Sequence, residues 1–352
     1  MKAVTMVCYS SDFNQALKFT DSQQIPQPDA TKNHVRVRVH YAATNPIDYK
    51  FAEGVLSDLM KHPFPCPVGR DFSGTVDILP EGIPNPAGLR LGDKVCGWMD
   101  HTQLDQGSMA EFLCCPIAQL AKVPDSVSMR DAACLPLVAN TVFNGLVKEM
   151  GLVPGCGKKI LILGGSSATG MLAIQLAKFY GCSEISCTST NADLCKSLGA
   201  TQVIDYRKSD WSDNIRDFDF VFDSVGGKEE YERSVHALKK KGMFYSIVGD
   251  VNKGKMSVGR LLGAMCTACC RNCCTTGPKY RMAPALSPNA DNGLTFFLDL
   301  VRQGTIMVTV DPSCEPAAGG SPFKFNQAAA VAMFNKQASG RCKGKLVMEI
   351  AA

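Results

Sequence analysis

The sequence predicts an α/β protein that combines a doubly wound parallel sheet with a second, β-rich domain. Two observations carry this prediction. Up to about residue 130, short strand-like runs are separated by Gly and Pro, and from Asp131 onward strand-like and helix-like runs alternate. Such alternation is typical of a parallel sheet with helices on both faces. The 352 residues, 45% of them hydrophobic, are enough to build two domains.

The β-rich part has its clearest strand at 35–40, where Val alternates with basic residues as expected for a half-buried strand. Three shorter strands are predicted at 74–79, 94–98 and 110–115. After Gly304, strand-like runs return at 305–310 and 345–350 around a helix at 326–337. We expect this last segment to rejoin the β-rich domain, which is then split in the sequence.

The alternating part supplies the strands and helices of the parallel sheet. Its predicted strands lie at 160–163, 184–188, 202–204, 218–222 and 243–248. Two predicted helices begin at about Ala168 and Ala192, and a third spans 229–239. The expected domain boundaries are therefore 1–133 for the first β-rich part, 134–307 for the domain with the parallel sheet, and 308–352 for the return segment.

The segment 158–178 holds the most specific signal, because an apolar strand meets a Gly/Ser loop (164–170) that opens an amphipathic helix. Small residues at a helix N-terminus let backbone N–H groups approach a phosphate closely, and the helix dipole favours its charge. The dinucleotide motif G-x-G-x-x-G requires glycine at three positions, which here are Gly165, Ser167 and Gly170. The loop favours dinucleotide binding, and an ordinary tight turn between strand and helix is the alternative.

The end of the second predicted strand bears on which dinucleotide is bound. NAD sites place Asp or Glu about 20 residues after the glycines to bind the ribose 2′-hydroxyl. Here the strand ends Cys-Thr-Ser-Thr-Asn (187–191), without an acid. Hydroxyl and amide groups leave room for a 2′-phosphate, so the sequence favours NADP(H), with Ser189 and Tyr206 as its ligands. Thr190 can instead cap the next helix with Asp193, and both interpretations can hold together.

Composition excludes several other functions. A net charge of +4 is too small to indicate nucleic-acid binding, and no apolar run reaches the roughly 18 residues of a membrane span. We see no targeting signal and expect a soluble, cytoplasmic protein. The cysteine count of 17 is odd, which favours reduced thiols over a disulfide framework. None of the five histidines lies in a metal-binding pattern, so we predict no catalytic zinc.

One cysteine-rich segment keeps several interpretations open. It reads Cys266-x-x-Cys269-Cys270-x-x-Cys273-Cys274. Overlapping C-x-x-C pairs can ligate zinc or an iron–sulfur cluster, but on one helix this spacing puts the thiols on a single face and does not wrap a metal. S-acylation beside a basic patch, redox sensing and a cysteine-tolerant surface insertion are the alternatives, and we favour the insertion.

Two polar segments interrupt the β-rich part. Residues 45–50 follow the alternating strand and gather polar groups that suit a cleft, although Asp48 can equally cap a short helix. Residues 69–74 place Arg70 and Asp71 inside an otherwise apolar turn. We interpret Arg70 and Asp71 as a buried structural ion pair.

Taken in order, the motifs resemble those of the zinc-free medium-chain dehydrogenase/reductases, which include quinone oxidoreductases, ζ-crystallin and the reticulon-interacting branch. The matching motifs run from end to end: NPIDYK (45–50), PVGRDFSG (67–74), GDKVCGW (92–98), GSMAEF (107–112), LPLVANTVFNGL (135–146), the Gly/Ser loop, LGATQVIDYR (198–207), FDFVFDSVGG (218–227) and SGRCKGKLVMEI (339–350). The resemblance implies a Rossmann domain beside a split GroES-like catalytic domain, with the cofactor in the cleft between them. It also implies a homodimer that pairs through the edges of the Rossmann sheets.

The same resemblance implies that zinc is absent. Asn45 stands where the zinc-dependent members carry a Cys ligand, and Gly69-Arg70-Asp71 replaces their Gly-His-Glu. The four-Cys lobe that they carry, expected near 95–115, is missing. These departures agree with the lack of a metal-binding histidine pattern.

The resemblance also assigns roles to single residues. Asn45, Asp48 and Tyr49 form the catalytic group, in which Asn45 contacts the nicotinamide ribose. Leu56 stands where many members have a proton-donating Tyr, which leaves Tyr49 or water as the acid. The residues implied to bind the cofactor are Thr141, Gly165, Ser166, Ser167, Ala168, Thr169, Gly170, Ser189, Tyr206, Asp223, Val225, Gly226, Arg341 and Lys343. Ser167-Ala168 replaces the family's Gly-Gly, which crowds the pyrophosphate loop.

The activity that follows is NADPH-dependent, zinc-independent hydride transfer to a small electrophile, either a quinone or an α,β-unsaturated carbonyl compound. One alternative is a reductase of 2-enoyl thioesters. Another is an NADPH-binding scaffold or sensor with little turnover, regulated through the cysteine segment 266–274.

Overall fold

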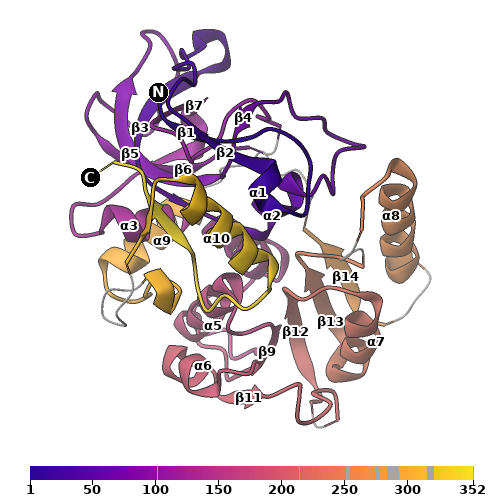
Figure 1. Cartoon of the computed structure of the whole chain (residues 1–352). Coiled ribbons are helices and arrows are strands. Elements are labelled where there is room, and N and C mark those ends of the chain that lie inside the picture. The colour runs from indigo at the N-terminus through magenta and orange to yellow at the C-terminus, as the bar shows by residue number, and fades with distance from the viewer. Residues whose placement is uncertain are drawn as a thin grey trace. The chain divides into compact units, whose positions relative to one another are not determined.

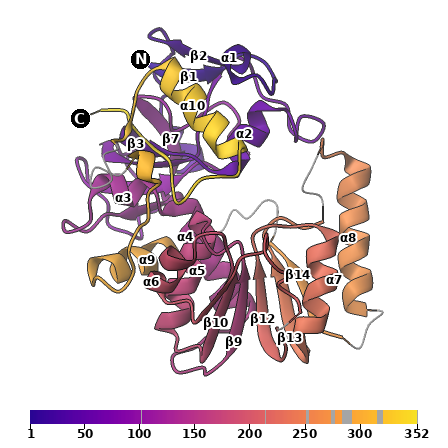
Figure 2. The same cartoon turned by 60° about the horizontal axis from the view of Figure 1, so that its bottom comes forward.

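The computed structural model describes residues 1–100, 102–213, 215–250, 254–273, 277–283, 293–314 and 321–351. The chain folds into two compact units (Figures 1 and 2). The first unit combines Met1–Asn140 with Leu286–Ala352, and the second consists of Thr141–Ala285. Within the described residues, no helix combines the length and the apolar character that a membrane crossing requires.

In its described part, the first unit contains two sheets. A small antiparallel sheet pairs β1 (Ala3–Met6) with β2 (Leu17–Thr20) and β4 (Cys66–Pro67). The larger sheet has the order β15-β16-β3-β5-β6-β8, with β7 also paired to β3. Its strands are β3 (His34–Ala43), β5 (Asp71–Ile78), β6 (Lys94–Trp98), β7 (Phe112–Pro116), β8 (Leu120–Lys122), β15 (Phe323–Lys324) and β16 (Val347–Glu349).

The predicted return of the last segment to the β-rich domain is confirmed. Strand β16 runs antiparallel to β3, with Val347 opposite Ala43. Helix α10 (Gln327–Ala338) contacts α1 (Phe13–Ala16). The rings of Phe13 and Phe334 meet edge to face at 5.5 Å, both nearly fully buried. The two ends of the chain therefore share one hydrophobic core, and in Figure 1 the yellow and indigo segments lie together.

Three further helices belong to the first unit: α2 (Pro46–Ala52), α3 (Met129–Ala133) and α9 (Gly293–Arg302). Helix α4 (Pro136–Val142) crosses the boundary between the units. The units change after Asn140 and after Ala285, whereas the sequence predicts changes after 133 and 307. Residues 293–314 group with the first unit because α9 contacts β8 and Val310 pairs with Lys345.

In its described part, the second unit is built on a six-stranded parallel sheet with the order β11-β10-β9-β12-β13-β14. The strands are β9 (Lys159–Leu163), β10 (Glu184–Thr188), β11 (Gln202–Ile204), β12 (Phe218–Asp223), β13 (Leu238–Ser246) and β14 (Lys279–Met282). Numbered along the chain this is the order 3-2-1-4-5-6 of a doubly wound dinucleotide fold. The predicted Rossmann-type sheet is confirmed.

Helices α5 (Ala168–Phe179), α6 (Ala192–Leu198), α7 (Lys228–Ala237) and α8 (Val258–Cys273) flank this sheet. Figure 2 shows α5 and α6 beside β9 and β10, and α7 and α8 beside β13 and β14. Strand β9 lies in the middle of the sheet, and its apolar run 160–163 is fully buried. A strand covered on both faces needs a continuous apolar run, which is why 160–163 does not alternate.

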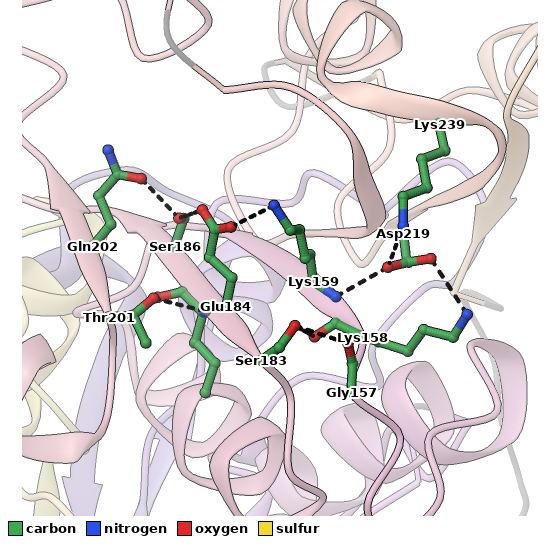
Figure 3. Close-up of polar contacts among 11 residues, drawn as sticks. Gly157, Lys158, Lys159, Ser183, Glu184, Ser186, Thr201, Gln202, Asp219 and Lys239 are labelled. Atoms are coloured by element: carbon green, nitrogen blue, oxygen red, sulfur yellow. Dashed lines mark hydrogen bonds and ion pairs between the residues drawn. The ribbon is translucent and has the colours of Figure 1, made fainter.

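Charged residues form ion pairs and hydrogen bonds at the amino ends of the central strands (Figure 3). Asp219, at the start of β12, accepts a hydrogen bond from the Lys159 backbone N–H at 3.0 Å. Its carboxylate also pairs with the ammonium groups of Lys158 (3.3 Å) and Lys239 (3.0 Å). Lys159 in turn pairs with Glu184 on β10 at 2.8 Å. Both carboxylates at this edge are therefore paired with lysines.

Candidate functional site

The carboxyl ends of β9 and β12 meet where the strand order of the sheet reverses. Leu163 at the end of β9 lies opposite Asp223 at the end of β12. Open α/β sheets bind their ligands outside the carboxyl ends of the strands at this reversal. The segments that follow the two strands, 164–170 and 224–226, are called here the strand-end loops. They form the candidate binding site of the second unit.

The glycines of the first strand-end loop have no room for a side chain. A Cβ at Gly170 would come within 2.2 Å of the Gly164 carbonyl oxygen, and one at Gly165 within 2.6 Å of the Cys187 sulfur. Helix α5 can therefore approach the sheet closely, with its N-terminus directed at the end of β9. This close approach is what glycine provides in a dinucleotide loop, so the loop fits such a cofactor.

Ser167, which replaces the middle glycine of the motif, caps helix α5. Its hydroxyl oxygen accepts a hydrogen bond from the Gly170 N–H at 3.0 Å. Ser224 donates its own hydroxyl proton to the Leu163 carbonyl at 2.7 Å, so Ser167 donates to Ser224 across 3.2 Å. Both strand-end loops are thereby joined. The N–H groups of Ala168 and Thr169, in the first turn of α5, have no partner inside the helix and suit an anion.

The end of β10 places Ser189 inside a turn. Ser189 is 2% exposed, and its hydroxyl oxygen accepts a hydrogen bond from the Asn191 N–H at 3.0 Å. Helix α6 begins at Ala192 with Asn191 in the N-cap position, so the interpretation of Thr190 as the cap is wrong. Tyr206, after β11, is 58% exposed. A role for Ser189 and Tyr206 in binding a 2′-phosphate stays a prediction.

Asp223 organises the second strand-end loop. One carboxylate oxygen accepts the N–H groups of Val225 and Gly226, both at 2.9 Å, and the other accepts the hydroxyl of Ser246 at 2.6 Å. Burial raises the pKa of Asp223 despite these hydrogen bonds. Gly226 has a positive φ of 80°, and a Cβ there would lie 2.5 Å from Val248. Asp223 thus holds the loop in shape, with the Val225 side chain exposed.

Three other predicted cofactor residues lie outside the strand-end loops. Thr141 belongs to the last turn of α4 and is partly exposed. Arg341 and Lys343 are exposed in the first unit, where the Lys343 N–H donates to the Asp311 carboxylate at 2.9 Å. Their predicted contacts with a cofactor stay predictions.

The first unit contains a buried polar cluster formed by Asn45, Asp48, Asp71 and Lys345. The Lys345 ammonium donates to the Asn45 side-chain oxygen at 2.6 Å and to Asp71 at 2.8 Å. The Asn45 side-chain N–H donates to the same Asp71 oxygen at 3.0 Å, and the Leu137 N–H donates to the other. Both oxygens of Asp71 are therefore satisfied by donors of the protein itself.

Asp48 is the member of the cluster with an unsatisfied atom. Its Oδ2 accepts the Asn45 N–H at 2.6 Å, as expected for a residue in the first turn of α2. Its Oδ1 is buried and has no hydrogen-bond partner among the described residues. Burial raises the pKa of Asp48 to about 7, although Arg70 and Lys345 oppose the shift. Asp48 therefore both caps the helix and holds a proton near neutral pH.

The expected ion pair between Arg70 and Asp71 is wrong. Both side chains are buried, but Asp71 pairs with Lys345. Arg70 donates to the carbonyl oxygens of Asp100 and Gln103 at 3.1 and 2.9 Å, and its guanidinium lies 4.8 Å from the centre of the Phe51 ring. Adjacent residues in extended backbone point to opposite sides, which separates the two charges.

Tyr49, predicted as an acid, is half-buried on α2. Its pKa is raised mainly by burial and, to a smaller extent, by the negative charge of Glu53. Lys345 was not among the predicted site residues. The signal that points to it is a lysine two residues before strand β16, since a lone charge beside an apolar run needs a partner when buried.

The cysteine segment begins on helix α8. Cys266, Cys269 and Cys270 are exposed on it, and the side chains of Cys273 and Cys274 lie outside the described residues. Within the described residues, no three or more His, Cys, Asp or Glu side chains are grouped to hold a metal ion. The alternatives for this segment stay open.

Comparisons with known proteins add to this geometry. A model of the alcohol dehydrogenase GroES-like domain matches residues 31–125, and a zinc-binding dehydrogenase model matches residues 168–269. The 2-methylene-furan-3-one reductase of Solanum lycopersicum is 32% identical over 328 residues, 91% of this chain and 73% of that protein. A chloroplastic NADPH-dependent alkenal/one oxidoreductase of Arabidopsis thaliana is 32% identical over 231 residues, 64% of this chain and 57% of that protein.

A solved structure supports the same relationship. The quinone oxidoreductase from Coxiella burnetii is 26% identical, with a TM-score of 0.79, and the match covers 100% of this chain and 99% of that one. The likeness therefore extends over both units of the fold.

Proposed function

Because the chain belongs to the medium-chain dehydrogenase/reductase family, in its quinone oxidoreductase-like branch, we propose that it reduces a quinone or an α,β-unsaturated carbonyl compound with NADPH. The observation that carries the proposal is the pair of strand-end loops at the reversal of the parallel sheet. There a capped helix N-terminus offers the N–H groups of Ala168 and Thr169 to an anion. The names of the similar reductases supply the class of acceptor.

The cofactor's nicotinamide supplies the hydride when it is bound. The residues that would hold NADPH are those of the loop 164–170 for the pyrophosphate, and Ser189 and Tyr206 for the 2′-phosphate. Thr141, Asp223, Val225 and Gly226 would border the rest of the cofactor, and Arg341 or Lys343 would add positive charge. The lack of an acid after β10 supports NADPH over NADH.

We propose that the reaction proceeds without zinc. Asn45 and Asp71 stand where zinc-dependent members carry ligands, but their side-chain oxygens already accept hydrogen bonds from Lys345 and Leu137. A metal would have to displace the buried Lys345 ammonium. Polarisation of the acceptor then depends on hydrogen bonds, which suits quinones and enones better than simple ketones.

The proton that the reduced acceptor requires comes, in this proposal, from α2 or from water. Asp48 keeps a proton near neutral pH, and the Tyr49 phenol keeps its proton well above it. Asn45 would bind the nicotinamide ribose beside them. We further propose a cytoplasmic homodimer that pairs through β14, an edge strand of the described sheet, which light scattering of the purified protein can test.

The central test is a titration of the purified protein with NADPH and with NADH, followed by turnover assays with 9,10-phenanthrenequinone and small enones. We expect tighter binding of NADPH and oxidation of NADPH by at least one acceptor. Tighter binding of NADH would refute the cofactor assignment. Tight NADPH binding without turnover would favour a scaffold, and preferred turnover of crotonyl-CoA would identify an enoyl-thioester reductase.

A substitution tests the phosphate pocket directly. Ser189→Asp keeps an oxygen that can accept the Asn191 N–H but adds a negative charge where the 2′-phosphate is expected. NADPH should bind at least tenfold more weakly, and NADH should bind as well as before or better. Ser197→Asp is the matched control, because it adds the same charge to an exposed position of α6 away from the strand end. Equal effects of the two variants on NADPH would overturn the assignment.

A further inference from the structure

Two cysteines of the second unit lie in contact at the amino ends of the central strands. The sulfur atoms of Cys156 and Cys182 are 3.7 Å apart. Both side chains are half-buried, so a small reagent can reach them. Cys156 precedes β9 and Cys182 precedes β10, and the proposed binding of the cofactor uses neither residue. The arrangement therefore calls for an explanation of its own.

The two backbone segments are fixed beside each other by hydrogen bonds. The Cys156 N–H donates to the Tyr180 carbonyl and the Gly157 N–H to the Gly181 carbonyl, each at 3.1 Å. The Ser183 N–H donates to the Lys158 carbonyl at 2.9 Å, next to the polar contacts drawn in Figure 3. The sulfurs thus stay near each other, because the segments that carry them are paired on both sides of the cysteines.

The same segments have freedom to close the remaining gap. A disulfide has a sulfur–sulfur distance of about 2.05 Å, so the two atoms must approach by roughly 1.7 Å. Glycines flank the cysteines, and Gly155, Gly157 and Gly181 have positive φ angles of 71°, 59° and 73°. Glycine adopts many backbone conformations at little cost, so small rotations of these turns can bring the sulfurs together.

We propose that Cys156 and Cys182 form a reversible disulfide when the protein meets a low-molecular-weight disulfide such as oxidised glutathione. The Cys156 thiolate attacks one glutathione sulfur, which forms a mixed disulfide and releases one glutathione thiolate. The Cys182 sulfur then attacks Cys156 and releases the second. Two protein thiols are oxidised to one disulfide, and their two protons end on two glutathione thiols.

The surroundings of Cys182 bear on the order of attack. Burial raises the pKa of the Cys182 thiol, and the contact with Cys156 adds to this effect. A raised pKa leaves little of Cys182 as thiolate in the reduced protein, so Cys182 takes the second, intramolecular step. Thiol exchange requires a thiolate that the reagent can reach.

The cross-link would close a covalent loop around the site. Residues 156–182 contain β9, the strand-end loop 164–170 and the whole of α5. A disulfide over a loop of this length restricts the unfolded chain and stabilises the folded one. We expect the unfolding midpoint of the oxidised protein to rise by about 5 °C, and to return on reduction.

The experiment incubates the full-length reduced protein with oxidised glutathione, blocks the remaining thiols and maps the peptides by mass spectrometry. Trypsin alone leaves Cys182, Cys187 and Cys195 in one peptide, so cleavage after Glu184 is added. The expected product joins residues 150–158 to residues 179–184 and disappears with dithiothreitol. Cys156→Ser should abolish this product, whereas Cys8→Ser, at another half-buried cysteine, should leave it.

Other thiols of the chain act as internal controls. Cys266, Cys269 and Cys270 are exposed and should acquire glutathione, which shows that the reagent has reacted. Cys187 and Cys195 are hydrogen-bonded to each other but fully buried, and should stay reduced. If these exposed thiols react while Cys156 and Cys182 remain free, or carry separate glutathione adducts, the proposal is wrong. An unchanged unfolding midpoint in a fully cross-linked sample would refute its stabilising role.

Discussion

The buried polar cluster of the first unit and the strand-end loops of the second satisfy their polar groups in different ways. In the cluster, a buried ammonium balances a buried carboxylate, and the hydrogen bonds among Asn45, Asp71 and Lys345 are completed within the protein. In the loops, a hydroxyl group and backbone N–H groups donate to Asp223. The N–H groups of Ala168 and Thr169, in the first turn of α5, have no partner inside the helix. The first arrangement thus satisfies its own side-chain oxygens, apart from Asp48 Oδ1, while the second offers N–H groups to an anion.

The largest expected effect comes from breaking the charge balance of the cluster. Lys345→Met leaves Asp71 buried without its cation and should lower the free energy of unfolding by about 4 kcal/mol. Lys343→Met, two residues away and exposed, is the control and should change it by less than about 0.5 kcal/mol. Urea denaturation of both variants measures the difference. Adding Asp71→Asn to Lys345→Met should restore part of the loss, and a further loss would contradict the charge-balance account.

The second prediction concerns Asp48, the unsatisfied member of the cluster. Its folded-state pKa of about 7 lies above its ordinary value, so the folded protein holds this proton while the unfolded chain releases it. The stabilising contribution is complete below about pH 4 and is lost as the pH rises through about 7, by roughly 3.5–4 kcal/mol at pH 7. Thermal unfolding of the wild type relative to Asp48→Asn should show this decline. The exposed Asp125→Asn variant should follow the wild type, and parallel curves for all three would disprove the raised pKa.

The third prediction tests the close packing of the strand-end loop. Gly170→Ala places a methyl group against the Gly164 carbonyl and should cost about 2 kcal/mol of stability while weakening NADPH binding. Gly263→Ala, on α8 in the same unit, has open space around its Cβ and should stabilise by about 0.5–1 kcal/mol. Calorimetry of the two variants checks the contrast. Similar behaviour of both would mean that the loop adapts without strain.

The smallest expected effect concerns the helix cap. Ser167→Ala removes the hydroxyl that accepts the Gly170 N–H and should lower stability by about 1 kcal/mol. The neighbouring Ser166→Ala should have little effect, because the N-cap of α5 is Ser167. Denaturant midpoints resolve a difference of this size. If both substitutions cost the same, the cap does not depend on the Ser167 side chain.

The sequence predicted the parallel sheet, the return of the last strand and the position of the strand-end loop. These features depend on local patterns, such as the apolar run of β9 and the small residues after it, which the chain displays within a few residues. Ser167 was also readable as an N-cap, because a serine directly before a helix is a common start signal. Compared with the G-x-G-x-x-G motif alone, Ser167 is only a missing glycine, and its role as a cap is not visible.

The polar cluster could not be predicted in the same way. Lys345 is 300 residues from Asn45 and 274 from Asp71 in the chain, and no local pattern specifies which carboxylate it pairs with. The pairing of β16 with β3 determines the partners of Lys345, because it places Lys345 beside Asn45 and Asp71. Arg70 illustrates the same limit, since its neighbour in sequence is not its partner in space.

Because β16 lies near residue 350, it is synthesised after the rest of its sheet, and this affects the order in which the two units fold. Among the described residues, the last strand of the second unit ends at Met282, so its sheet can form once that point of the chain has left the ribosome. The first unit must wait for Lys345 and β16 before Asp71 receives its cation and β3 pairs with β16. Residues 1–140 are therefore translated long before their fold can be completed. A nascent chain stalled before residue 345 should present a protease-resistant second unit and a protease-sensitive first one.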